Sequence, residues 1–154
     1  AFSPRVELFC RIAAPRFKTP AVEGPDMNPV VHQTYLMVRD VEESVEFYRN
    51  VVGLETSDVT ESRAKFDTGE CTLVLEEDFD EAVLSEFGLE PPGEERGIGV
   101  IVVVEVDDVE AVHERAERAG ADVRMTPRTV EWGRKMCLVA DPDGYVLEIS
   151  RPTE

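Results

Sequence analysis

The chain has 154 residues, 42% of them apolar, which is enough for one ordinary domain with a hydrophobic core. Its net charge is -17, from 33 acidic and 16 basic residues. Nucleic acids and anionic membranes would be repelled by such a surface, so both are excluded as partners. No apolar run reaches the roughly 18 residues of a membrane span, and we expect a soluble protein.

The lysine, arginine and cysteine content indicates the kind of organism and the cellular compartment in which the protein is found. Three lysines stand against 13 arginines. An acidic, lysine-poor surface suits a cytoplasm with molar salt, where the Debye length falls to about 3 Å, so we consider a halophilic source, with an ordinary acidic protein as the alternative. Cys10, Cys71 and Cys137 form no C-x-x-C pair. They favour a reducing cytoplasm over a disulfide framework or a zinc knuckle.

The beginning of the chain differs from the rest. Residues 1–26 carry a net charge of +1, contain four prolines and show no sustained periodicity. We therefore expect residues 1–28 to be a disordered N-terminal extension. Met27 directly precedes the first convincing strand, so a start codon assigned too far upstream would explain the segment.

The first regular unit spans residues 29–77. Residues 30–38 predict a strand, and Asp40 predicts a helix N-cap with Glu43 placed as in a capping box. One helical face follows at spacings of 4, 3 and 4 and ends at a glycine: Val41, Val45, Tyr48, Val52 and Gly53. Short strands are predicted at 55–60, 63–68 and 71–77. Residues 78–97 then form an acidic connector, whose "EAVLSEFGL" predicts a short helix.

The same order of elements repeats over residues 98–152. A strand at 99–106 is followed by a helix capped by Asp108, with its apolar face spaced 3, 4 and 3: Val109, Val112, Ala116 and Ala119. Further strands are predicted at 121–126, 134–140 and 145–150. Asp40 and Asp108 are 68 residues apart, so the chain holds two copies of one unit. The predicted fold class is α+β: two tandem βαβββ modules, 29–77 and 98–152, that form a cupped mixed sheet with helices on the outer face and act as one domain.

Three segments carry a resemblance to a known family. "VRDVEESVEFYRNVVGLE", "VDDVEAVHERAERAGA" and the ending "WGRKMCLVADPDGYVLEI" resemble the vicinal-oxygen-chelate superfamily over about residues 30–152. This superfamily includes glyoxalase I, extradiol dioxygenases, fosfomycin-modifying enzymes and bleomycin-resistance proteins. The ending is the most specific part, and it identifies the superfamily without identifying one activity, because this fold hosts several chemistries.

The resemblance implies a divalent metal site in the cup. Its ligands would be a His or Gln on the first strand of each module and a Glu on the last strand, a mix that suits ions such as Ni, Zn, Mn or Fe. The equivalent positions here are Gln33, Ile101, Val74 and Glu148. Two of the four keep a donor and two are apolar. The sequence therefore predicts an incomplete metal set, Gln33 and Glu148, and we expect no metal cofactor or only weak binding.

The two histidines offer little to complete the set. His32 would face the cup in place of Gln33 only if the strand were bulged by one residue. His113 lies between charged residues in the second helix, and we expect it on the surface. An extradiol dioxygenase, which needs two histidines and a carboxylate in one open site, is therefore disfavoured.

Three hypotheses for function follow. The first is a metal-free protein that binds a small molecule in an apolar pocket, lined by Tyr35, Met37, Val74, Ile101, Val103 and Trp132 around Gln33 and Glu148. The second is a glyoxalase-type lyase or isomerase, with a weakly held metal or with Glu148 as a general base. The third is a filled cup in which Glu148 pairs with Arg134 or Arg151. We rank them in this order.

Two features of the predicted cup are open to more than one interpretation. Trp132 borders the cup mouth in relatives and would contact ligand there, or it packs on the last hairpin. Many relatives are dimers, and edge strands rich in Arg and Val are compatible with a homodimer.

Overall fold

The computed structural model describes residues 29–154, and the expected N-terminal extension lies outside them. The first module forms a four-stranded mixed sheet in the order β1-β4-β3-β2, in which β1 and β4 are parallel. Its elements are β1 (Gln33–Val38), α1 (Val41–Phe47), a wider helical turn η1 (Tyr48–Val52), β2 (Thr56–Val59), β3 (Arg63–Asp67) and β4 (Thr72–Glu77).

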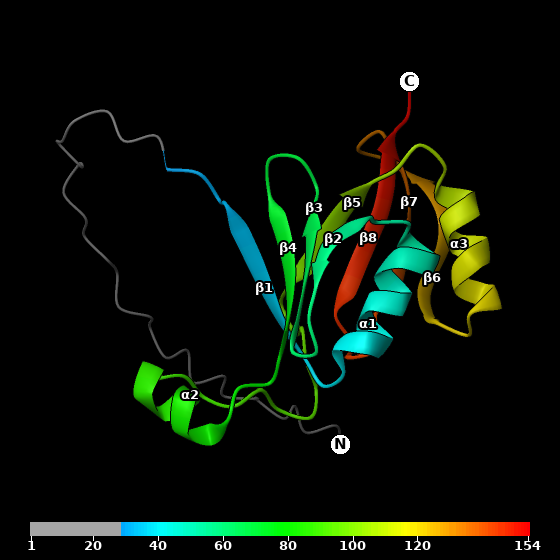
Figure 1. The fold of residues 1–154 in the computed structure, drawn as a ribbon. Helices are drawn as coiled ribbons and strands as arrows, with labels where there is room; N and C mark the ends of the chain where they lie inside the picture. Colours follow the sequence, from blue (N-terminus) through cyan, green and yellow to red (C-terminus); the bar gives the residue numbers. More distant parts are fainter. Residues whose placement is uncertain (1–28) are drawn as a thin grey trace, which may run out of the picture. The chain divides into compact units, whose positions relative to one another are not determined.

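The second module repeats this arrangement as β5-β8-β7-β6, with β5 and β8 parallel. Its elements are β5 (Ile101–Glu105), α3 (Val109–Arg118), β6 (Asp122–Val130), β7 (Arg134–Ala140) and β8 (Val146–Pro152), and the connector carries α2 (Glu81–Phe87). Figure 1 shows the two sheets as separate layers. The predicted α+β class with two mixed βαβββ sheets is confirmed, and the described strands form two sheets that are not closed into one.

Both predicted helix caps are present. The Asp40 side chain accepts a hydrogen bond from the Glu43 main-chain N–H at 2.9 Å, and Asp108 accepts one from Ala111 at 3.0 Å. Each cap satisfies one of the main-chain donors that the first helical turn leaves unpaired. The two helices therefore begin where the sequence predicts.

Three elements differ most from the prediction at their ends. The first strand begins at Gln33, where its partner β4 begins at Thr72. The first helix widens after Phe47, and the wider turn buries Tyr48, Val51 and Val52 together. The strand β6 runs on through Pro127 to Val130, because it is an edge strand whose register shifts between Met125 and Arg128 and a proline is tolerated there.

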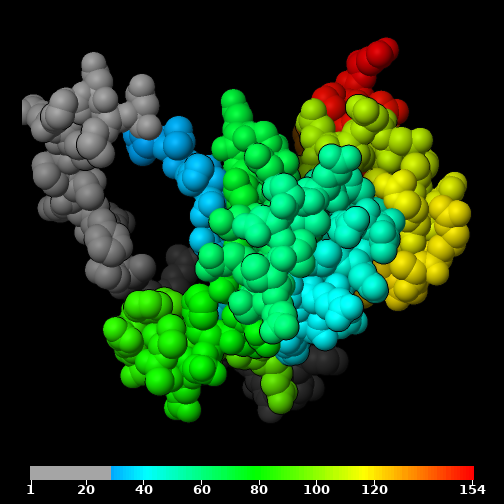
Figure 2. Space-filling model, viewed as in Figure 1, coloured from blue at the N-terminus to red at the C-terminus, as the bar shows by residue number. Residues whose placement is uncertain are grey.

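The two modules share one hydrophobic core. Buried side chains of α1, η1, β3 and β4 form a single cluster with those of α3, β7 and β8. On α3, Arg115 Nε donates to the Val51 carbonyl at 2.9 Å, which joins α3 to η1. Figure 2 shows the segment of α1 and η1 lying against α3. This shared burial is the main reason for the two modules to fold as one unit.

A second set of contacts joins the modules at the turn before β8. The Tyr48 hydroxyl donates to Asp141 at 2.9 Å, and the Tyr145 hydroxyl donates to the Met37 carbonyl at 2.9 Å. Burial and the neighbouring Asp141 carboxylate raise the pKa of Tyr48 well above its usual range, so this hydroxyl stays protonated and remains a donor. No helix in the described part of the chain is long and apolar enough to cross a membrane.

Candidate functional site

The predicted site residues that lie on strands of the second module are on the face of its sheet that α3 does not cover. Leu147 and Ile149 are fully buried against the helix side, so Glu148 between them points to the opposite face. In the register, Glu148 lies between Val103 on β5 and Leu138 on β7. We call this surface the helix-free face of module 2. Ile101 and Val103 on it are each 58% exposed.

An arginine lies beside the predicted carboxylate ligand on this face. Arg134 Nε is 3.9 Å from Glu148 Oε1 and donates to the Ser150 hydroxyl at 3.1 Å. Arg134 Nη2 also donates to Glu105 Oε2 at 2.9 Å. The Glu148 side chain is 18% exposed, so this charged contact is largely shielded from water. The polar part of the face is therefore one connected cluster of a guanidinium, two carboxylates and a hydroxyl.

The predicted site residues of the first module lie on the corresponding face of the other sheet. Gln33, Tyr35 and Met37 alternate with the buried Leu36 and Val38. The Tyr35 hydroxyl donates to Gln33 Oε1 at 3.1 Å, and Tyr35 is 49% exposed.

Val74 departs from its predicted role as an open pocket wall. It lies between Tyr35 on β1 and Lys65 on β3 and is fully buried. The side chains around it in the sheet leave it no accessible surface.

Gln33 and Glu148 are each held by neighbours in their own module. The hydrogen-bond partner of Gln33 is Tyr35, and the charged neighbour of Glu148 is Arg134. Among residues 29–154 no contact joins the two, and no group of three His, Cys, Asp or Glu side chains is arranged to hold a metal ion.

The histidines occupy other positions. The main-chain register of β1 is continuous from Gln33 to Val38, so Gln33, and not His32, shares a face with Tyr35. The expectation of a surface His113 is wrong, because its side chain is only 14% exposed. His113 follows Val109 by four residues and precedes Ala116 by three, which places it on the covered face of α3. Trp132 is 70% exposed in the turn between β6 and β7.

The residues present do not fit the metal site that the family resemblance implies. Ile101 and Val74 offer no donor atom at two of the four positions, and Arg134 places a positive charge beside the Glu148 carboxylate. Cys137 is not a substitute ligand, because it is fully buried on the helix side of β7 and its burial raises the pKa of the thiol to about 11.

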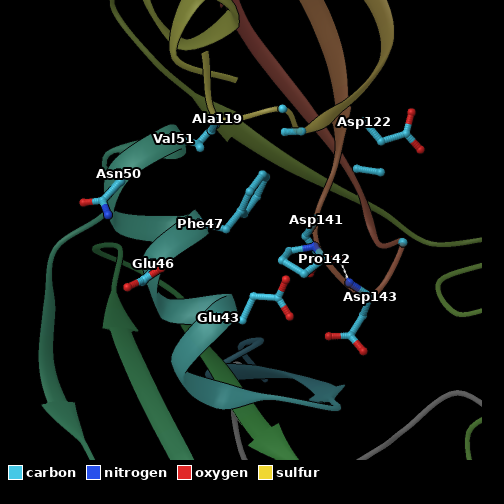
Figure 3. Close-up of a pocket in the computed structure, with 14 residues that line it drawn as sticks. Glu43, Glu46, Phe47, Asn50, Val51, Ala119, Asp122, Asp141, Pro142 and Asp143 are labelled. Atoms are coloured by element: carbon cyan, nitrogen blue, oxygen red, sulfur yellow. Dashed lines mark hydrogen bonds between the residues drawn. The ribbon is translucent and has the colours of Figure 1, made fainter. Parts of the chain in front are cut away.

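A separate hollow lies between α1 and the turn at residues 141–144. It has a volume of about 580 Å³, and Figure 3 shows Glu43 on α1 pointing toward the turn with Pro142 and Asp143. Its buried carboxylates already have partners, since Asp141 accepts from Tyr48 and Asp143 accepts from Arg39 at 3.2 Å. None of the predicted site residues lines this hollow.

The sequence hypothesis named Arg134 only as one of two partners for Glu148 and missed Ser150 and Glu105. The alternation of side chains along the strands could have predicted both residues. Ser150 lies two residues after Glu148, and Glu105 pairs with Ser150 in the register, so all three share a face. Arg151 alternates to the other face and is excluded by the same rule.

Comparison with known proteins places the chain in a family. Residues 30–149 match the model of the glyoxalase/bleomycin resistance protein/dioxygenase superfamily. The chain belongs to this superfamily. No curated protein matches it.

Solved structures show the same fold. A glyoxalase/bleomycin resistance protein/dioxygenase from Nocardioides is 24% identical, with a TM-score of 0.65 over 84% of this chain and 87% of that one. A glyoxalase-related enzyme from Fulvimarina pelagi is 21% identical, with a TM-score of 0.66 over 80% of this chain and 88% of that one. A superfamily enzyme from Burkholderia phytofirmans PsJN is 19% identical, with a TM-score of 0.63 over 79% and 98%. At these identities the likeness concerns the fold of the superfamily.

Proposed function

We propose that this superfamily member binds a small molecule on the helix-free face of module 2 and does so without a metal ion. The observation that carries the proposal is the place of Arg134. Its guanidinium lies 3.9 Å from Glu148, the one carboxylate that occupies a ligand position of the family. A divalent ion at Glu148 would have to share that carboxylate with a fixed positive charge and would find apolar side chains at the equivalent positions.

The composition of the face supports a binding role. Ile101 and Val103 supply an exposed apolar surface, and the cluster of Arg134, Glu148 and Ser150 lies beside it. Apolar surface with a few placed polar groups is the usual make-up of a small-molecule site. The apolar part supplies affinity through burial, and the polar cluster orients the ligand.

Metal analysis of the purified protein tests this proposal. We expect much less than one metal ion per chain after incubation with Ni, Zn, Mn or Fe and dialysis, and no increase in melting temperature on adding them, because ligand binding stabilises the native state by mass action. The measurements are mass spectrometry of the metals and thermal melts. Stoichiometric metal that disappears in Glu148→Gln but persists in Glu114→Gln, an exposed control on α3, would overturn the proposal in favour of the glyoxalase-type enzyme.

We further propose a homodimer in which a second copy closes over the helix-free faces, so that the small molecule on module 2 lies between the two chains. Tyr35, Ile101 and Val103 are each about half exposed, and contiguous exposed apolar side chains are typical of interaction surfaces. We also propose that the protein is cytoplasmic. Sedimentation equilibrium should give the mass of two chains, and Val103→Arg should shift it to one because a buried guanidinium without a partner is costly. A monomeric wild-type protein at about 100 μM would contradict the dimer, since protein–protein contacts of standard size are usually tighter than this.

A further inference from the structure

The strands β1 and β5 are both edge strands of their sheets, and residues of both strands line one cleft between the modules. We call the line between these two strands the seam. The repeat makes its two ends equivalent. Met37 and Glu105 lie 68 residues apart near the ends of β1 and β5, and Tyr145 and Cys71 are the residues directly before β8 and β4. At one end Met37 of module 1 lies beside Tyr145 of module 2. At the other end Glu105 of module 2 and Cys71 of module 1 line the same cleft.

The first end of the seam is closed by a tyrosine. The carbonyls of His32 and Val38 accept hydrogen bonds from Thr72 and Asp78, so these two residues of β1 point their main chain toward β4. Main-chain groups alternate along a strand, and the Met37 carbonyl consequently points to the free edge of β1. There it accepts the Tyr145 hydroxyl of the second module at 2.9 Å.

The second end of the seam has the same main-chain arrangement. The Val106 N–H donates to the Ser150 carbonyl at 3.0 Å, so Val106 points toward β8 and the Glu105 carbonyl points to the free edge of β5. The residue equivalent to Tyr145 is Cys71, which has neither a ring nor a hydroxyl. Within residues 29–154 no side chain donates to the Glu105 carbonyl as Tyr145 does to Met37.

A cleft occupies the space at this second end. It has a volume of about 560 Å³, within the usual range of small-molecule sites, and is the space between β5 and the core side of β1 and β4. Its lining is mainly apolar, with Thr34, Thr68 and Cys71 as small polar groups and Glu105 as the one charged residue. The Glu105 side chain is turned toward Arg134, at 2.9 Å.

We propose that this seam cleft binds a small neutral phenol. The aromatic ring takes the space that the Tyr145 ring occupies at the other end, and the hydroxyl donates to the Glu105 carbonyl as Tyr145 donates to Met37. The apolar lining favours a neutral ring over an ionised ligand, because burying a charge there would lack a partner. The cleft shares Ile101, Val103 and Glu105 with the helix-free face of module 2, but neither Glu148 nor Arg134 lines it. The site therefore holds whether or not Glu148 binds a metal.

The probe for the test is p-cresol, which is the tyrosine side chain without its main chain. We expect saturable binding of one molecule per chain, measured by calorimetry and by NMR chemical shifts. Toluene has the same ring and methyl group without the hydroxyl, and it should bind about threefold to tenfold more weakly, as expected for one lost hydrogen bond. Equal affinity for the two compounds would overturn the hydroxyl contact, and lack of saturable p-cresol binding would overturn the site.

A substitution that fills the cleft provides a second test of the proposal. Cys71→Tyr restores at this end the residue that closes the other end, so we expect p-cresol affinity to fall at least about tenfold, as for a site that lacks space for its ligand. Ser57→Tyr adds the same side chain at an exposed position on β2 and should leave binding unchanged. Undiminished binding by a folded Cys71→Tyr protein would contradict the proposal.

A measurement on the wild-type chain covers the case in which that variant does not fold. Saturating p-cresol should slow alkylation of Cys71 by iodoacetamide at least about threefold, followed for the Cys71 peptide by mass spectrometry, because a bound ring shields a half-buried thiol. An unchanged rate would overturn the proposal. Metal content at Glu148 is a separate readout, so metal binding would reject the proposed function and leave this site standing.

Discussion

Replacing Arg96 with methionine is expected to lower the free energy of unfolding by about 3 kcal/mol, the lower end of the cost of breaking a buried ion pair. The Arg96 side chain is 5% exposed. Its guanidinium donates to the Met37 carbonyl at 2.9 Å and to Asp78 at 2.7 Å, and it lies 3.5 Å from Asp143. Asp143 keeps Arg39 and Asp78 is one-third exposed, which limits the loss. Urea unfolding followed by circular dichroism measures the change.

The matched control for Arg96 is Arg128→Met. Arg128 is exposed on β6, and within residues 29–154 it makes no ion pair, so this substitution should change stability by less than about 0.5 kcal/mol. Arg96→Lys should recover only part of the loss, because an ammonium group cannot make the two-pronged contact with Asp78. Similar stabilities for Arg96→Met and Arg128→Met would show that the connector is not anchored at Arg96.

The second large effect is expected at Asp141, the first residue of the "DPDG" turn. Its buried carboxylate accepts hydrogen bonds from the Tyr48 hydroxyl at 2.9 Å and from the main-chain N–H groups of Asp143 at 3.0 Å and Tyr145 at 2.9 Å. Asp141→Ala removes all three and leaves the Tyr48 hydroxyl buried without its acceptor. We expect a loss of about 3–4 kcal/mol, less than the sum of three hydrogen bonds at about 1.5–3 kcal/mol each, because the Ala variant no longer has to bury a carboxylate.

A second variant separates the hydrogen bonds from the charge at Asp141, and an exposed aspartate serves as the control. Asp141→Asn keeps an oxygen for the two N–H groups and should lose about 1 kcal/mol, the size of one ordinary hydrogen bond. Asp67→Ala, at an exposed residue at the end of β3, should cost less than about 0.5 kcal/mol. Thermal and urea unfolding of the three proteins give these differences. A cost at Asp141 no larger than that at Asp67 would mean that the turn does not hold the modules together.

Local sequence signals predicted most of the elements, because each depends on near neighbours. The helices α1 and α3 follow from apolar residues spaced three and four apart and from the caps at Asp40 and Asp108. The 68-residue repeat predicted two equal modules, and the "WG" to "LEI" ending predicted the superfamily that the comparison then showed. The error at His113 came from weighing its charged neighbours above its spacing from Val109.

The alternation of side chains along a strand explains how much of the candidate site could be predicted. Glu148 had to point away from the helix side because Leu147 and Ile149 point toward it. The same alternation puts Arg134 on the face of Glu148 and Arg151 on the other face, once β7 is known to pair with β8 through Leu138 and Glu148. That register depends on a hairpin whose length the sequence predicts only within a residue or two, and a slip of one residue would exchange the two faces.

The sequence by itself determined the two modules and their helix faces and caps, because these are local. The resemblance to the superfamily then marked the four positions equivalent to its metal ligands. Only the tertiary structure decided that Arg134 lies 3.9 Å from Glu148, that Val74 is fully covered, and that Tyr145 closes one end of the seam while Cys71 leaves the other open. These features join residues that are far apart in the chain or belong to different modules. Their positions depend on how two separately formed sheets pack around one shared core, and that packing is a sum of many weak contacts which no short segment encodes.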